Sequence, residues 1–246
     1  MYRIWPPAAA GTLDEADIER LYGYPPDTPK WVAVNFVSSV DGAVTIAGRS
    51  RGLTNSADRA VYPLGSNLSD LILVGAGTAS IEEFTGIDPD DEQRELRARH
   101  GLAPVPPIAV VTSGNSLPPD APVITDVRTP TIVITRAAAP TRLRDAWAAA
   151  GADVLVAGTE TVDLAAAVAR LADRGLGRIH CDGGPTLFGS LLRAGAVDEL
   201  RLTISPLLVS GAAGRIACGA AMDPAALRLD SVLAADDTLL MRYLVA

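Results

Sequence analysis

The stretch from Arg178 to Leu192 constrains this chain more than any other. A short apolar strand, Ile179 to Cys181, meets two glycines, Gly183 and Gly184, and then a sequence typical of a helix. Glycines let backbone N–H groups approach a ligand closely, and Pro185 fits the first helical position, where a missing donor costs nothing. The N–H groups of the next turn then point at any anion bound there. The pattern predicts a strand, a phosphate-binding turn and a helix.

The composition is typical of a globular protein. Hydrophobic residues make up 48% of the 246 residues, charged residues make up 20%, and the mean hydropathy is +0.23. No apolar run reaches the ~18 residues that a membrane helix needs. The N-terminal residues lack the apolar segment of a signal peptide, and the two cysteines, Cys181 and Cys218, offer no disulfide framework. We therefore expect a cytoplasmic protein that does not bind membranes.

The charge distribution argues against a nucleic-acid partner. The net charge is −8, and Lys30 is the only lysine in the chain. Binding to nucleic acid depends on clustered basic side chains, which this chain lacks. Local arginines must therefore bind any anionic ligand.

Apolar runs that suit buried strands alternate with stretches that suit helices. Strands are expected at residues 31–37, 71–74, 108–111, 131–135, 154–156, 179–181 and 199–204. Helices are expected near Thr54, after Gly75, and at residues 92–99, 141–150, 162–174 and 185–192. This alternation predicts an α/β protein with a mostly parallel sheet and helices on both faces. The final pair of apolar runs, 227–233 and 239–245, predicts an antiparallel hairpin.

A single α/β domain over residues 30–246 is the simplest division of the chain. Residues 1–29 form a lead-in segment with a short helix from Leu13 to Leu21. Pro63 is expected to weaken or shorten the helix that begins near Thr54. Residues 85–107 are polar and charged, so we expect them to leave the core.

Two glycine-rich turns follow strands that should lie in one parallel sheet. Gly75 and Gly77 belong to the turn at residues 74–78, and the second turn is at residues 181–186. Ligands of open α/β sheets bind at the carboxyl edge, and two neighbouring anion sites suit a pyrophosphate. The single-domain dinucleotide fingerprint is absent, because Ser80 stands where its third glycine would be. Taken alone, the first turn is more typical of a plain tight turn, and only the pair of turns favours a ligand site.

Two aspartates at strand ends are candidate functional groups with structural alternatives. Asp41 lies in Ser39-Val40-Asp41-Gly42, which is also typical of a hairpin turn. Asp182 suits either a helix cap or a ligand contact. His180 and Cys181 are adjacent on a strand and should point to opposite faces, which favours core positions over a shared metal.

Signatures of several other enzyme classes are missing from the chain. The H-x-E and P-C-x-x-C motifs of zinc deaminases have no match, nor do the G-x-S-x-G nucleophile elbow and the G-x-x-x-x-G-K-[ST] loop. We therefore expect no metal site and find no support for a hydrolase or an ATPase.

The combination of Ser39-Val40-Asp41-Gly42, the turn at 74–78 and the turn at 182–187 resembles the reductase domain of bacterial riboflavin biosynthesis, over roughly residues 30–245. In that family the domain forms the C-terminal half of a bifunctional deaminase/reductase. The resemblance implies a dihydrofolate-reductase-like fold and a homodimer. It also implies an NADPH-dependent reductase that converts the ribosyl group of 5-amino-6-(5-phosphoribosylamino)uracil to ribityl. We expect no deaminase half, in agreement with the missing zinc-deaminase signature.

The resemblance and the turn patterns together give a set of expected site residues. Arg136, beside Thr135, is the candidate partner of the NADPH 2′-phosphate. The residues expected at the cofactor are Gly75, Gly77, Thr78, Glu82, Ser113, Arg136, Gly183, Gly184, Pro185, Thr186 and Leu187. The residues expected at the substrate are Ser39, Ser50 and Asp182, with Asp41 and Asp182 as the catalytic carboxylates.

Two departures from the family pattern concern the substrate phosphate. Ser66 stands where the biosynthetic enzymes place an arginine, and residues 84–89 lack a second substrate arginine. Losing bidentate phosphate recognition should weaken binding of that substrate. Arg49, Arg51 and Arg59 are candidates to compensate, although each is equally compatible with a solvated surface charge.

Two other functions remain open from the sequence. One is a reductase of the same fold that acts on dihydrofolate or on another pteridine or pyrimidine. The other is a dinucleotide-binding protein without catalytic activity.

Overall fold

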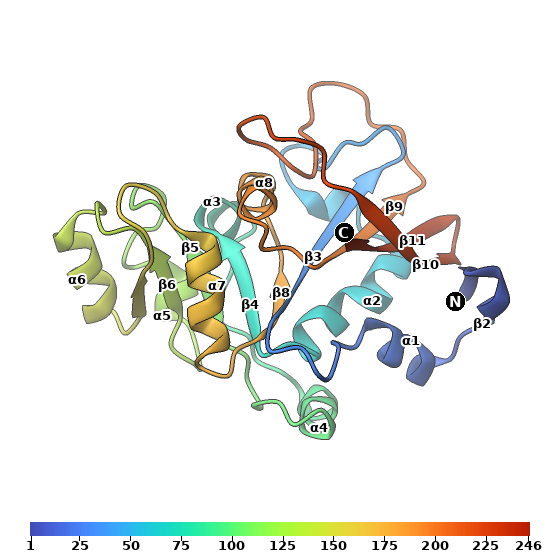
Figure 1. Cartoon of the computed structure of the whole chain (residues 1–246), viewed down its shortest axis with the longest axis horizontal. Helices are drawn as coiled ribbons and strands as arrows, with labels where there is room; N and C mark the ends of the chain where they lie inside the picture. The colour runs from blue at the N-terminus through green and yellow to red at the C-terminus, as the bar shows by residue number, and fades with distance from the viewer.

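The apolar runs along the chain become the central strands of one 11-stranded sheet in the computed structural model, which describes all 246 residues (Figure 1). The strands are β1 (Tyr2–Trp5), β2 (Gly11–Thr12), β3 (Trp31–Ser39), β4 (Leu71–Gly75), β5 (Ile108–Val111), β6 (Ile132–Thr135), β7 (Asp153–Val156), β8 (Arg178–Cys181), β9 (Glu199–Ser205), β10 (Leu227–Ala235) and β11 (Thr238–Val245). Their order in the sheet is β2-β1-β10-β11-β9-β3-β8-β4-β5-β6-β7.

The sheet is parallel from β9 to β7 and antiparallel from β2 to β9. Strands β3, β8, β4, β5, β6 and β7 pair in parallel along the chain of neighbours, and β3 also pairs in parallel with β9. Strands β10 and β11 form the antiparallel hairpin that the sequence predicts. The predicted architecture, mostly parallel with an antiparallel C-terminal hairpin, is confirmed.

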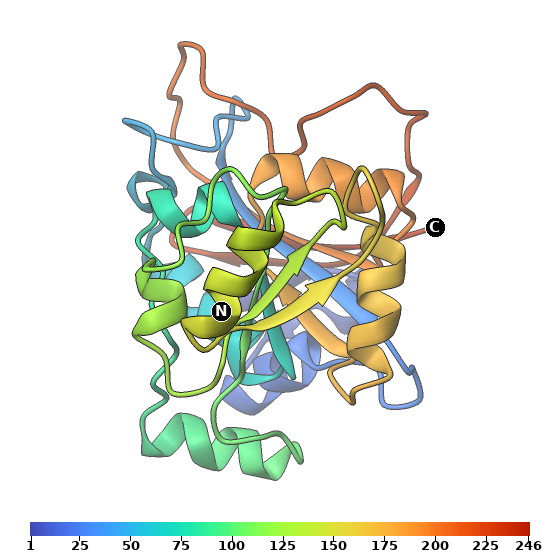
Figure 2. The ribbon, with the colours of Figure 1, turned by 90° about the vertical axis from the view of Figure 1, so that its left-hand side faces the viewer.

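Helices cover both faces of the sheet (Figures 1 and 2). They are α1 (Glu15–Tyr22), α2 (Ser56–Asn67), α3 (Ala76–Ile81), α4 (Asp91–Arg99), α5 (Pro122–Thr125), α6 (Thr141–Ala149), α7 (Leu164–Ala172) and α8 (Pro185–Arg193). Side chains alternate along the strands, so Leu71 and Leu73 pack toward α7 and α8, whereas Ile72 and Val74 pack toward α3, α5 and α6. None of the helices is long and apolar enough to span a membrane.

Local sequence accounts for many of the helix boundaries. Asp14 and Asp90 close capping boxes at the starts of α1 and α4, and Asn55 accepts a hydrogen bond at the start of α2. Gly151 and Gly175, with positive φ, follow the ends of α6 and α7. Glycine adopts this left-handed conformation without strain, which explains its use after a helix end.

Helix α2 differs from its prediction. The sequence predicts that Pro63 weakens or shortens this helix, but α2 continues through Pro63 to Asn67. Buried Ala57, Val61 and Gly65 pack this helix against its neighbours, and this packing offsets the hydrogen bond that proline lacks. The prediction was therefore wrong for a tertiary reason.

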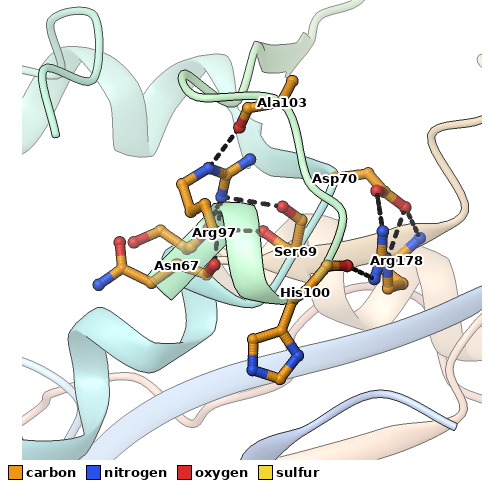
Figure 3. A network of polar contacts seen from close by, with 8 residues as sticks. Asn67, Ser69, Asp70, Arg97, His100, Ala103 and Arg178 are labelled. Carbon is orange, nitrogen blue, oxygen red and sulfur yellow. Dashed lines mark hydrogen bonds and ion pairs between the residues drawn. The ribbon is translucent and has the colours of Figure 1, made fainter. Parts of the chain in front are cut away.

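The C-terminal end of α2 is held by a buried arginine from α4 (Figure 3). The guanidinium of Arg97 is fully buried and donates hydrogen bonds to the carbonyl oxygens of Ser66, Ser69 and Ala103 at 2.6, 3.0 and 2.7 Å. Carbonyls at a helix end have no partners within the helix, and Arg97 supplies the buried carbonyls of Ser69 and Ala103 with a donor and adds one to that of Ser66. Part of the polar segment 85–107 thus packs under α2 rather than leaving the core.

The lead-in segment contributes to the main sheet as well as carrying its predicted helix. Strand β1 pairs antiparallel with β10, which the sequence does not reveal. Strand β11 lies between β10 and β9, and Leu240 is only 1% exposed. The apolar C-terminal strand is therefore an interior strand and has no free edge to offer a second subunit.

Candidate active site

A cavity of about 410 Å³ opens at the carboxyl ends of β3 and β8. Its walls come from the end of β3, the segment 44–54, helices α2 and α3, and the turn between β8 and α8. Six residues predicted from the sequence line it: Ser50, Thr78, Glu82, Asp182, Gly184 and Pro185.

The two glycine-rich turns lie side by side, as a parallel sheet requires. The Gly75 N–H donates a hydrogen bond of 2.8 Å to the Gly183 carbonyl, and the Asp182 N–H donates one of 2.9 Å to the Leu73 carbonyl. Helices α3 and α8 therefore begin next to each other (Figure 1). This arrangement brings two helix N-termini to one end of the cavity.

The turn at Gly183 and Gly184 leaves no room for side chains. Gly183 has a φ of +74°, and a Cβ there would lie 2.7 Å from Cζ of Phe36. A Cβ on Gly184 would lie 2.2 Å from Oγ1 of Thr78. Both glycines are therefore required for the backbone to pass this close to β3 and α3.

The N-terminus of α8 has free hydrogen-bond donors. Its N-cap is Gly184, and no side chain caps the helix. The N–H groups of Thr186 and Leu187 have no acceptor within the chain. Asp182 therefore does not cap α8, and the first turn presents its donors to a ligand.

Asp182 instead contacts two rings. Its Oδ2 accepts a hydrogen bond of 3.2 Å from the Tyr62 phenol, and its Oδ1 lies 2.8 Å from His180 Nε2 without the alignment of a hydrogen bond. The charge of Asp182, together with burial, raises the pKa of Tyr62, so this phenol keeps its proton and acts as a donor.

The predicted core positions of His180 and Cys181 agree with the structure. The His180 side chain is 1% exposed, and its ring fills the space above Gly65, where a Cβ would lie 2.1 Å from the ring. Cys181 packs into the apolar core on the other face, and burial raises the pKa of its thiol to about 12. No group of three or more His, Cys, Asp or Glu side chains is arranged to hold a metal ion.

Helix α3 is tied to the segment that forms the opposite wall. Oε1 of Glu82 accepts hydrogen bonds of 2.9 Å from both the N–H and the hydroxyl of Ser50. Arg49 pairs with Glu83 at 3.2 Å. Arg51 is the only basic residue that lines the cavity, whereas Arg59 lies exposed on the surface of α2.

Ser39 and Asp41 are not among the residues that line the cavity. The Asp41 carboxylate accepts hydrogen bonds from the Ser39 hydroxyl and from the N–H groups of Val209 and Ser210. The Ser39 hydroxyl and then the two backbone donors lower the pKa of Asp41 to about 2. The structure therefore places this carboxylate as an anchor of the segment after β9.

Ser113 and Arg136 lie further along the same edge of the sheet. They follow β5 and β6, and the Arg136 guanidinium donates to the carbonyls of Ser113 and Glu160 at 3.1 and 2.5 Å. Ser66 lies at the end of α2, outside the cavity lining. Ser113 and Arg136 thus lie at the same edge of the sheet as the cavity, but they do not line the cavity.

Two lining residues on α2 are missed by the sequence patterns. Tyr62 and Asp58 are four residues apart, so they occupy one face of the helix. Asp58 is only 3% exposed, and burial raises its pKa. The i, i+4 spacing of Asp58 and Tyr62 could have indicated that they share a site, but the same spacing is equally typical of a solvated helix face.

Comparison with known proteins agrees with this geometry. Residues 30–241 match the family described as RibD C-terminal domain. The chain belongs to this family. A 2,5-diamino-6-ribosylamino-4(3H)-pyrimidinone 5′-phosphate reductase of Methanothermobacter thermautotrophicus is 33% identical over 74% of this chain and 80% of its own length. The protein with the same description from Archaeoglobus fulgidus is 30% identical over 74% of this chain and 82% of its own length.

A solved structure shares the fold of this RibD C-terminal domain. A pyrimidine reductase-like protein from Corynebacterium diphtheriae superposes with a TM-score of 0.79 at 23% identity, covering 93% of this chain and 98% of its own. The resemblance identified from the three motifs is therefore confirmed for the family and for the fold. Membership places the chain in the RibD-type pyrimidine reductase family.

Proposed function

We propose that this protein uses NADPH to reduce the ribosyl group of a phosphorylated ribosylaminopyrimidine to ribityl. One observation carries the proposal: the N-termini of α3 and α8 lie side by side, joined by the hydrogen bond between Gly75 and Gly183. They lie beside a cavity that contains the carboxylate of Asp182. The family match and the reductase activity of the relatives support the same reaction class.

The residues at the paired turns fit a dinucleotide phosphate. The free N–H groups of Thr186 and Leu187 suit a pyrophosphate, and Gly183 and Gly184 let the turn that carries them pack closely against Phe36 and Thr78. NADPH, when bound, supplies the hydride. Thr78 stands against Gly184 and orients that end of the site.

Arg136 is proposed at the 2′-phosphate end of the cofactor. Its two carbonyl contacts hold the guanidinium between the segments after β5 and β7. An arginine fixed in this way needs little ordering when a phosphate binds. Replacing Arg136 with alanine should reduce the preference for NADPH over NADH, measured as the ratio of the two dissociation constants.

The chain's own groups would position the substrate. Asp182, fixed by Tyr62, presents an acceptor for substrate hydroxyls, and Arg51 is the cation available for the phosphate. Ser50 is fixed by Glu82 on the facing wall. Positioning of this kind accounts for a large part of the acceleration of a hydride transfer. A catalytic role for Asp41 remains a prediction, which Asp41→Asn would test.

The experiment is a turnover assay with purified protein. NADPH oxidation is followed with three compounds. They are 2,5-diamino-6-ribosylamino-4(3H)-pyrimidinone 5′-phosphate (the diaminopyrimidinone compound), 5-amino-6-(5-phosphoribosylamino)uracil (the uracil compound) and dihydrofolate. Oxidation with one of the first two compounds supports the proposal, and oxidation with dihydrofolate alone supports the pteridine alternative. NADPH binding without turnover of any compound would instead indicate a non-catalytic dinucleotide-binding protein.

A further inference from the structure

The floor of the cavity contains a carboxyl group that the proposed function does not yet use. Asp58, on the first turn of α2, lines the cavity but is only 3% exposed. Its Oδ1 is fully buried and has no hydrogen-bond partner. Buried polar atoms in folded proteins nearly always have partners, and a buried acceptor without a donor costs free energy.

No ion pair compensates the charge of Asp58. Burial is the main influence and raises its pKa, while the hydroxyls of Thr203 and Thr54, acting as hydrogen-bond donors, lower it. The charge of Arg59 has the smallest effect, and this side chain lies exposed on the helix surface. A ligand that brings N–H donors to this carboxylate would therefore satisfy it.

The positions of the charged side chains orient a substrate in the cavity. Arg51 is the only basic lining residue and is exposed, so a phosphate group would bind near the mouth. The opposite end of a ribosylaminopyrimidine phosphate is its ring. The ring would then be the part that reaches the buried Asp58.

Building on the proposed function, we propose that Asp58 binds the edge of the pyrimidine ring and selects an amino group over an oxo group at ring position 2. The ring of the diaminopyrimidinone compound presents two donors side by side, the N3–H and the 2-amino group. A carboxylate can accept both at once. The uracil ring presents one donor and one carbonyl oxygen, and that oxygen would face the carboxylate lone pairs.

The substitution Asp58→Asn gives this proposal a sharp test. Asparagine has the same shape but offers one acceptor and one donor, which matches the N–H and carbonyl edge of uracil. The wild-type protein should bind the diaminopyrimidinone compound more tightly than the uracil compound by on the order of 10- to 100-fold. In Asp58→Asn this preference should be lost or reversed.

Affinities are measured by calorimetry on the full chain with NADP⁺ present, so that no turnover occurs. Asp91→Asn is the matched control, because Asp91 lies in the first turn of α4 and its side chain is 99% exposed. This control should keep the wild-type preference. The wild-type ratio alone is a second measurement that does not depend on the folding of any variant.

The outcomes separate this proposal from the function on which it rests. The wild-type protein could reduce either compound and yet bind the uracil compound more tightly, or bind both equally. Either result refutes the role of Asp58, and the reductase function stands. An unchanged preference in a folded Asp58→Asn variant refutes it equally. A wild-type protein that binds and reduces neither compound refutes the proposed function itself.

Discussion

The phenol of Tyr62 donates a hydrogen bond to Oδ2 of Asp182 over 3.2 Å and thereby joins the middle of helix α2 to the end of strand β8. These residues are 120 positions apart in the chain. Because the charge of Asp182 raises the pKa of Tyr62, the phenol stays protonated and keeps the carboxylate in one orientation. The candidate active site therefore depends on how α2 packs against the sheet.

Removing this donor should impair catalysis more than folding. We expect Tyr62→Phe to lower kcat/KM by about tenfold, the effect of one lost hydrogen bond to a charged group. Steady-state kinetics and urea unfolding would measure the two effects. Tyr2→Phe, an exposed tyrosine on β1, is the control. A kcat/KM equal to that of the wild-type protein would show that Tyr62 does not position Asp182.

Adding one methyl group at the turn between β8 and α8 should weaken binding of the proposed cofactor. A Cβ at position 184 meets Oγ1 of Thr78 at 2.2 Å, so Gly184→Ala must displace α3 or the turn. We expect the dissociation constant for NADPH, measured by fluorescence titration, to rise on the order of 10- to 100-fold. Gly214→Ala should change nothing, since its Cβ makes only an ordinary contact with Val44.

The steric origin of that effect has its own check. Thr78→Ala removes the atom that the new methyl group would meet, so Gly184→Ala combined with Thr78→Ala should bind NADPH better than Gly184→Ala alone. If the double variant binds NADPH more weakly than either single variant, the clash is not the cause.

The buried arginine under α2 should be important for stability. Arg97→Met leaves the carbonyls of Ser69 and Ala103 without their donor and removes one donor from that of Ser66, and we expect a loss of about 3 kcal/mol in the free energy of unfolding. Arg99→Met removes only an exposed ion pair with Glu19, so the loss should stay below about 1 kcal/mol. Equal losses in urea unfolding would contradict this difference.

A buried ion cluster should make stability depend on acidic pH. Burial raises the pKa of Glu199, but the charges and hydrogen bonds of Arg201 and Arg242 together lower it by more. The resulting pKa is about 2, against an ordinary value of 4.5. A carboxyl group with a depressed pKa stabilises the folded state above its unfolded pKa. This contribution, about 3 kcal/mol, should be lost as the pH falls from 4.5 toward 2.

Thermal unfolding measured across that range would test the contribution of Glu199. In Glu199→Gln the dependence on pH between 4.5 and 2 should be weaker, because the titrating group is gone. The variant should also be less stable at neutral pH, because two buried guanidinium groups lose their carboxylate. A variant with an unchanged slope would assign the acid sensitivity to other carboxylates.

The predicted homodimer remains a prediction with a simple test. Light scattering should give twice the chain mass of 25.5 kDa. A dimer would have to use a surface other than the edge of β11, which is already paired on both sides.

Features that depend on short stretches of sequence could be predicted. The apolar runs gave the positions of β3 to β9, and the spacing of Gly75, Gly77, Gly183 and Gly184 placed two glycine-rich turns at one edge of the sheet. Strand β1 is mostly exposed, so it has no apolar run that would reveal it in the sequence. Hydrogen bonds to β10 and β2 hold it in the sheet. Its pairing could be known only from the assembled sheet.

The sequence by itself determined the positions of most strands and helices, the helix caps and the glycine turns, because backbone preferences and hydrophobic periodicity act over a few residues. Only the tertiary structure decided which side chains meet. Asp58 and Tyr62 belong to the cavity because α2 lies across the ends of β3 and β8, while Asp41 is taken up by the N–H groups of Val209 and Ser210. Such contacts join distant segments, and no local pattern encodes the packing that creates them.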